Sequence, residues 1–169
     1  MPVRSRACAH PARRALVIMI AALGLAQPAL ADSNEHATRA PLPLPPLPAY
    51  TQECAVCHVA YPPGMLPAVS WQHLMSNLGR HYGTDASLDP ATVRELSAWL
   101  MTNAGTYRRV AEAPPEDRIT RSAWFIRKHD EVPAATWKRA AVKSAANCNA
   151  CHARADQGDF NERNVRIPR

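Results

Sequence analysis

Aromatic residues and glycine are scarce in this sequence of 169 residues. Phe, Trp and Tyr together make up 6% of the chain and Gly contributes 6 residues, whereas Pro contributes 16. Long alternating strand runs joined by glycine turns are hard to find, and proline is disfavoured inside sheets. The composition therefore argues against an all-β sandwich or barrel. With 47% hydrophobic and 20% charged residues, we expect one or two small globular domains.

Acidic residues are absent from the first 31 positions. An apolar run over 15–26 and small residues up to Ala31 follow a basic start. This pattern is typical of a secretory signal peptide, and twelve apolar residues are too few for a spanning helix, which needs ~20. We expect residues 1–31 to be cleaved after about Ala31, leaving no transmembrane segment in the mature chain. Arg13-Arg14 also leaves a twin-arginine signal open, and either route ends outside the cytoplasm.

Positive charge is concentrated in this leader. The chain has a formal net charge of +6, of which four positive charges belong to residues 1–31: Arg4, Arg6, Arg13 and Arg14. The mature chain is therefore only weakly basic, and we expect no nucleic-acid partner.

All four cysteines of the mature chain lie in two CxxCH motifs, Cys54-Ala55-Val56-Cys57-His58 and Cys148-Asn149-Ala150-Cys151-His152. This spacing is typical of c-type haem attachment: both thiols of a motif lie on one side of a helical turn, where they can add to the vinyl groups of one haem, and the next His reaches the iron. A zinc site, a redox dithiol and disulfides are the alternatives. A zinc site does not require His after each pair, and a redox dithiol usually lies beside a βαβ pattern, which is absent here. The sequence predicts two covalently bound haem c groups.

Proline and polar runs divide the mature chain. Residues 32–50 contain a Pro-rich stretch that favours extended polyproline conformation, and we interpret them as an N-terminal arm, either a strap or a poorly ordered leader. A linker over 111–117, with its Pro114-Pro115 pair, separates a first haem domain over 51–110 from a second over 118–169.

Between the motifs the hydrophobic spacing is helical, so we expect a mainly α fold. Ser70 is the candidate cap of a helix running to Tyr82, and Asp89-Pro90 starts a second helix that Gly105 ends. In the second domain we expect helices over 122–129 and 133–146, then coil over 156–169.

Each iron needs a sixth ligand besides the proximal His58 and His152. His81 lies on the apolar face of its helix and His129 is the one histidine of the second domain outside the motif, so these two are the favoured distal ligands. The alternatives are His73 on the opposite face, His36 in the arm, and three methionines, Met65, Met75 and Met101. Thioether ligation by methionine raises a haem reduction potential, whereas two imidazoles lower it.

Several blocks of the chain resemble the bacterial dihaem cytochrome c family known as DHC. They are Ser70-Trp71-Gln72-His73-Leu74-Met75, His81 to Leu88, Arg127 to Asp130, Lys143 to Cys148 and Gly158 to Asn161. The resemblance implies a periplasmic electron carrier with two bis-histidine haems, a first domain like class I cytochromes c and a less regular second domain. It also implies a small oxygen-binding c-type haem protein and a membrane b-type cytochrome as partners. His81 and His129 match the distal-ligand positions of the family, whereas His73 departs from its pattern.

We expect an electron carrier that is not an enzyme. Two other functions remain open. One is an electron-transfer subunit of a larger reductase. The other is a small haem enzyme, a peroxidase or reductase, with one open iron position. No residue pattern marks a distal catalytic pocket, which favours the carrier.

Overall fold

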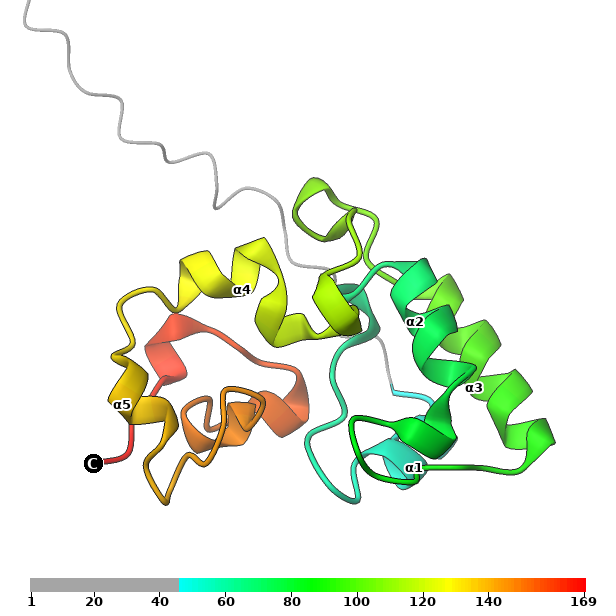
Figure 1. The fold of residues 1–169 in the computed structure, drawn as a ribbon, viewed down its shortest axis with the longest axis horizontal. Helices are drawn as coiled ribbons and strands as arrows, with labels where there is room; N and C mark the ends of the chain where they lie inside the picture. Colours follow the sequence, from blue (N-terminus) through cyan, green and yellow to red (C-terminus); the bar gives the residue numbers. More distant parts are fainter. Residues whose placement is uncertain (1–45) are drawn as a thin grey trace, which may run out of the picture. The chain divides into compact units, whose positions relative to one another are not determined.

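The computed structural model describes residues 46–169. The predicted signal peptide, most of the predicted arm and His36 lie outside the described residues. Between residues 46 and 169 the regular structure consists of five α-helices and short 3-10 turns, with isolated bridges and no strand (Figure 1). The prediction of a mainly α fold is confirmed. None of the helices in this part of the chain has the length and apolarity needed to cross a membrane.

Three helices build the first half of the described chain: α1 (Pro48–Cys54), α2 (Ala68–Met75) and α3 (Pro90–Thr102). Helix α2 packs along α3, and α1 also contacts α3 (Figure 1). The Asp89 carboxylate accepts hydrogen bonds from the first free amides of α3, those of Ala91 at 2.8 Å and Thr92 at 3.1 Å. The predicted start of this helix is confirmed, and it ends at Thr102, before Gly105. Helix α1 begins within the predicted arm, at Pro48.

An apolar core forms where these three helices meet. Trp71, in α2, also donates its indole N–H to the Pro63 carbonyl at 2.7 Å, which satisfies its polar atom inside the core. The buried members of the core are Tyr50, Leu66, Trp71, Met75, Leu96 and Leu100.

The helix predicted from Ser70 to Tyr82 is wrong at both ends. Helix α2 starts at Ala68, so Ser70 is a buried interior residue rather than a cap, and it ends at Met75. A 3-10 turn over Leu78–Arg80 then leads to His81. Tyr82 has φ +52, a left-handed backbone conformation that cannot continue a right-handed helix. The chain therefore turns before His81 instead of carrying it on a helix face.

The second half of the described chain has little regular helix. Helix α4 (Ala123–Lys128) is capped by the Ser122 hydroxyl, and α5 is a single turn (Ala134–Trp137). The predicted helix over 133–146 is wrong because the chain turns after Trp137, with Lys143 at φ +68. Beyond the second motif the chain has short 3-10 turns and isolated bridges but no α-helix or strand, which confirms the predicted coil.

The predicted linker packs against the end of the first half. The Tyr82 hydroxyl donates to the Glu116 carbonyl at 2.9 Å, and the Arg118 guanidinium lies over the Tyr82 ring, 4.0 Å from its centroid. His73 contacts the Asp117 carboxylate at 3.2 Å. These contacts fasten residues 116–118 beside His81, and the domain boundary at 111–117 stays a prediction.

Candidate haem sites

Cys54 and Cys57 of the first motif lie at the end of α1. Cys54 is the last residue of the helix, and Cys57 and His58 follow in the turn that leaves it. Both thiols are free, and burial raises the pKa of the half-buried Cys54 to about 11. Because a reactive dithiol needs a lowered pKa, this environment does not fit a redox CxxC centre.

The first histidine pair consists of His58 and His81. The His58 Nδ1 donates to the Val59 carbonyl at 2.7 Å, which leaves Nε2 for a metal. The Tyr61 ring stacks on His58 with centroids 4.8 Å apart. The His81 ring lies 6.2 Å from the His58 ring between centroids, with an interplanar angle of 24°.

The second motif begins in a 3-10 turn over Cys148–Ala150. The amides of Cys151 and His152 both donate to the Cys148 carbonyl, at 3.2 and 2.8 Å, which turns the chain so that the motif is compact. Burial raises the pKa of Cys148 to about 11 and also raises that of Cys151, and both thiols are free.

The second histidine pair consists of His129 and His152. His129 follows the last residue of α4, and its Nδ1 donates to the Phe125 carbonyl at 2.8 Å. The Phe125 ring stacks on it at 4.0 Å. His152 lies 6.1 Å from His129 between ring centroids, with an interplanar angle of 72°.

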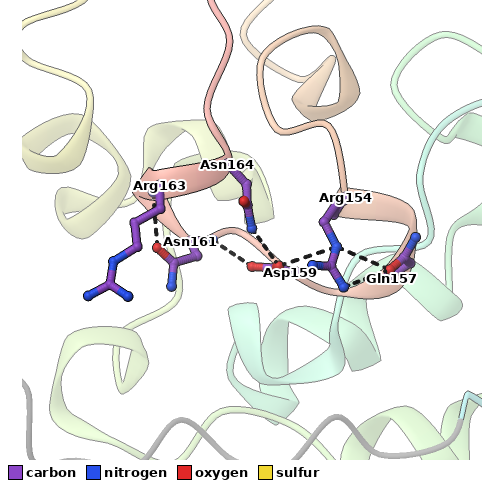
Figure 2. Close-up of polar contacts among 6 residues, drawn as sticks. All are labelled: Arg154, Gln157, Asp159, Asn161, Arg163 and Asn164. Atoms are coloured by element: carbon purple, nitrogen blue, oxygen red, sulfur yellow. Dashed lines mark hydrogen bonds and ion pairs between the residues drawn. The ribbon is translucent and has the colours of Figure 1, made fainter.

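A polar network holds the chain that follows His152 (Figure 2). The Asp159 carboxylate accepts from the Asn164 amide group at 2.8 Å and from the Asn161 backbone N–H at 2.9 Å, and lies 3.6 Å from the Arg154 guanidinium. Arg154 also donates to the Gln157 side chain, and Asn161 accepts from the Arg163 backbone N–H. The loop closed in this way places Phe160 beside His152, with centroids 5.4 Å apart.

Both histidine pairs fit a metal ion between their rings. An imidazole nitrogen binds a transition metal at about 2 Å and lies about 1.1 Å from its ring centre, so two rings that share one ion are about 6 Å apart between centres. The pairs measure 6.2 and 6.1 Å. Within residues 46–169, Nδ1 of His81 and Nδ1 of His152 are buried without a hydrogen-bond partner. Ser70 Oγ and Trp124 Nε1 are the other buried side-chain atoms without a partner in this part of the chain.

The lowered pKa values of His81 and His152 favour metal binding because they keep both imidazoles neutral. Burial, together with the neighbouring His58 and Arg118, lowers the pKa of His81. Burial and the neighbouring His129 lower that of His152, against an opposing effect of Asp159. A neutral imidazole keeps the lone pair that a metal requires.

The other candidate ligands lie elsewhere. The His73 side chain is 58% exposed and contacts Asp117. Met75 is buried in the core between the helices, and Met101 is exposed. No group of three or more His, Cys, Asp or Glu side chains between residues 46 and 169 is placed to hold a metal ion, so the two motifs do not assemble a four-cysteine zinc site.

Motif reading missed three residues that surround the histidines: Tyr61, Asp159 and Phe160. Tyr61 and Phe160 contact the rings of His58 and His152, and Asp159 closes the loop that carries Phe160. Asp159 and Phe160 lie in the Gly158 to Asn161 block that carries the family resemblance, whereas the one signal for Tyr61 is its position three residues after His58.

Comparisons with known proteins agree on one family. Residues 50–160 match the family model of dihaem cytochrome c. The solved structure of a dihaem cytochrome c from Shewanella baltica OS155 is 38% identical, covering 72% of this chain and 92% of that one, with a TM-score of 0.63. That of DHC from Rhodobacter sphaeroides is 41% identical, covering 70% of this chain and 100% of that one, with a TM-score of 0.61. No relative among curated proteins matches the chain.

Proposed function

This chain belongs to the dihaem cytochrome c family and is an electron-transfer haem protein with two haem c groups, and we propose that it is a periplasmic electron carrier whose irons are each held by two histidines. Cys54 and Cys57 attach the first haem, and Cys148 and Cys151 the second. His58 and His81 bind one iron, and His129 and His152 bind the other. Each bound haem supplies an iron that takes up and releases one electron.

The observation that carries this proposal is the separation of the rings within each histidine pair. At 6.2 and 6.1 Å between centroids, both pairs match the distance at which two imidazoles share one ion. Two histidine side chains bound to one haem iron would leave no open position for a substrate. Such a site changes oxidation state with little change of coordination, which suits a carrier better than a peroxidase or small-molecule reductase.

Hydrogen bonds to the backbone orient two of the four rings. The Val59 carbonyl fixes His58 and the Phe125 carbonyl fixes His129, so each pair contains one ring whose tautomer and orientation are set by the backbone. Ligands held in this way need little reorganisation when the charge on the iron changes.

The partners of the carrier are other redox proteins. The resemblance noted above favours a small oxygen-binding c-type haem protein and a membrane b-type cytochrome, and membership in a larger reductase is the alternative. Residues 111–169 hold eleven Lys or Arg side chains against five in residues 32–110. Because docking for electron transfer is weak and salt-sensitive, the more basic part is the expected docking region.

Replacing single histidines tests the ligand assignment. His81→Ala and His129→Ala should each convert one haem from low-spin to high-spin or give it a foreign sixth ligand, visible in the ferric absorption spectrum. His73→Ala is the matched control, since its side chain contacts Asp117, and it should leave the spectrum unchanged. A high-spin haem in the unmodified ferric protein, or one produced by His73→Ala, contradicts the proposal.

A further inference from the structure

Tyr61 lies three residues after His58 and is anchored to the core between the helices. Its backbone carbonyl accepts a hydrogen bond from the Tyr50 hydroxyl at 2.7 Å. Tyr50 belongs to α1, the helix that carries Cys54, and is only 4% exposed. The backbone of Tyr61 is therefore fixed relative to the first motif.

The side chain of Tyr61 contacts the histidine of the first motif and the chain just before the second motif. Its ring stacks on His58, with centroids 4.8 Å apart and an interplanar angle of 23°. Its hydroxyl donates to the Ala146 carbonyl at 2.7 Å, 85 positions further along the chain. The same carbonyl accepts from the Cys148 amide at 3.1 Å, so the hydroxyl is bonded to the turn that starts the second motif.

The same two segments also approach each other at a second point. Gly158, in the loop after His152, has φ +72, and a Cβ at this position would lie 4.0 Å from Cγ of Pro62, the residue after Tyr61. Tyr61 is therefore hydrogen-bonded to the chain before Cys148, and Pro62 lies close to the loop after His152.

We propose that Tyr61 is a positioning residue that holds the two haem attachment turns in one fixed arrangement for electron exchange between the irons. The inference rests on the proposed function. In the exchange one iron goes from ferrous to ferric while the other goes from ferric to ferrous, and no bond or proton moves. Tyr61 stays a neutral phenol throughout and acts through His58 and Ala146.

The test compares Tyr61→Phe with Tyr107→Phe in the two-haem protein. Tyr107 is a matched control because its hydroxyl donates to a backbone carbonyl, that of Gly64, at 2.8 Å but contacts neither motif. Losing one such hydrogen bond should raise amide hydrogen exchange at Asn147 and Cys148 about twofold to tenfold in Tyr61→Phe. In half-reduced samples, NMR of the haem methyl groups should show slower exchange of the electron between the haems. The ferric spectrum should stay low-spin.

Tyr61→Leu extends the test by removing the ring as well as the hydroxyl. It should also change the electron paramagnetic resonance signal of the ferric haem bound by His58, because the Tyr61 ring no longer stacks on that imidazole to orient it. The proposal is overturned if Tyr61→Phe matches Tyr107→Phe in both amide exchange and electron exchange. A high-spin iron in the unmodified protein would instead contradict the proposed function. The two failures are distinguishable because the amide exchange of Asn147 and Cys148 is measured independently of the spin state.

Discussion

Residues 46–110 and residues 118–169 each position one CxxCH motif and both members of one histidine pair, but different interactions stabilise the two regions. The first region buries eight hydrophobic side chains: Tyr50, Val59, Leu66, Trp71, Met75, Leu96, Leu100 and Val110. The second buries three, Phe125, Val142 and Ala155, and relies on the hydrogen bonds around Asp159 and on turns. The same chemical site is therefore built once on a helical core and once on a loop.

The comparison shows where the haem matters most for folding. A segment of about 50 residues with few buried side chains rarely folds without a disulfide, a metal or a cofactor. In the second region, the proposed iron between His129 and His152 and the bonds from Cys148 and Cys151 would close a loop that the polypeptide alone holds weakly. In the first region α2 packs along α3 through contacts between polypeptide side chains alone.

Preventing haem attachment at one motif at a time should have the largest effect. In the variant with both Cys148 and Cys151 changed to Ser, we expect amide protection to be lost throughout 118–169 and to persist in α2 and α3. In the variant with both Cys54 and Cys57 changed to Ser, part of the protection in α2 and α3 should remain. Hydrogen exchange with limited proteolysis measures both. A protease-resistant 118–169 without its haem contradicts the comparison.

Truncating a core side chain tests the first region. Leu100 is 1% exposed between the helices, and Leu100→Ala should lower the free energy of unfolding by about 2–5 kcal/mol because it leaves a cavity. The neighbouring Met101 is 39% exposed, and Met101→Ala should change it by less than about 0.5 kcal/mol. Denaturant unfolding followed by circular dichroism measures both. Equal effects of the two variants would show that this core contributes little.

Breaking the polar network tests the second region. Asp159→Ala removes the acceptor of the hydrogen bonds from Asn164 and Asn161. It should lower the free energy of unfolding by about 1–3 kcal/mol. It should also speed proteolysis near Phe160. Asp156→Ala, at an exposed position of the same loop, is the control and should have little effect. If Asp159→Ala leaves proteolysis unchanged, the haem alone holds this loop.

The sequence predicts the chemistry of the sites better than the path of the chain between them. The CxxCH motifs predict the attachment cysteines and the proximal histidines because covalent attachment requires a fixed spacing. The His81 position on an apolar face was inferred from a helix that in fact ends at Met75, so the structure brings His81 to His58 by a turn instead. Helical periodicity continues through such a turn, and only tertiary contacts decide where the helix stops.

Contacts across long stretches of chain lie beyond sequence patterns. Nothing in the residues near Tyr61 indicates that its hydroxyl meets Ala146. The loop after His152 is similar: Asp159 gathers its partners through an irregular backbone that has no period to detect. The start of α3 is predictable by contrast, because the capping Asp89 is adjacent in sequence to the helix it caps.

The smallest effect is spectroscopic and concerns the angle between the two rings of each pair. The rings of His58 and His81 are inclined by 24° and those of His129 and His152 by 72°. Nearly parallel imidazoles act on the same iron d orbital and split the two π-type orbitals, whereas nearly perpendicular ones act on one each and leave them close in energy. The ferric protein should therefore give two low-spin electron paramagnetic resonance signals, and the second pair should show the larger highest g-value.

Single substitutions beside the rings assign the two signals. Phe125 stacks on His129 at 4.0 Å, so Phe125→Leu frees that ring and should move only the signal with the larger g-value. Tyr61→Leu should move only the other one, since Tyr61 stacks on His58. Neither change removes a ligand, so both irons should stay low-spin. Two identical signals in the unmodified protein would show that both haems impose one ring geometry, and that the contrast between the core-built and loop-built regions does not extend to the irons.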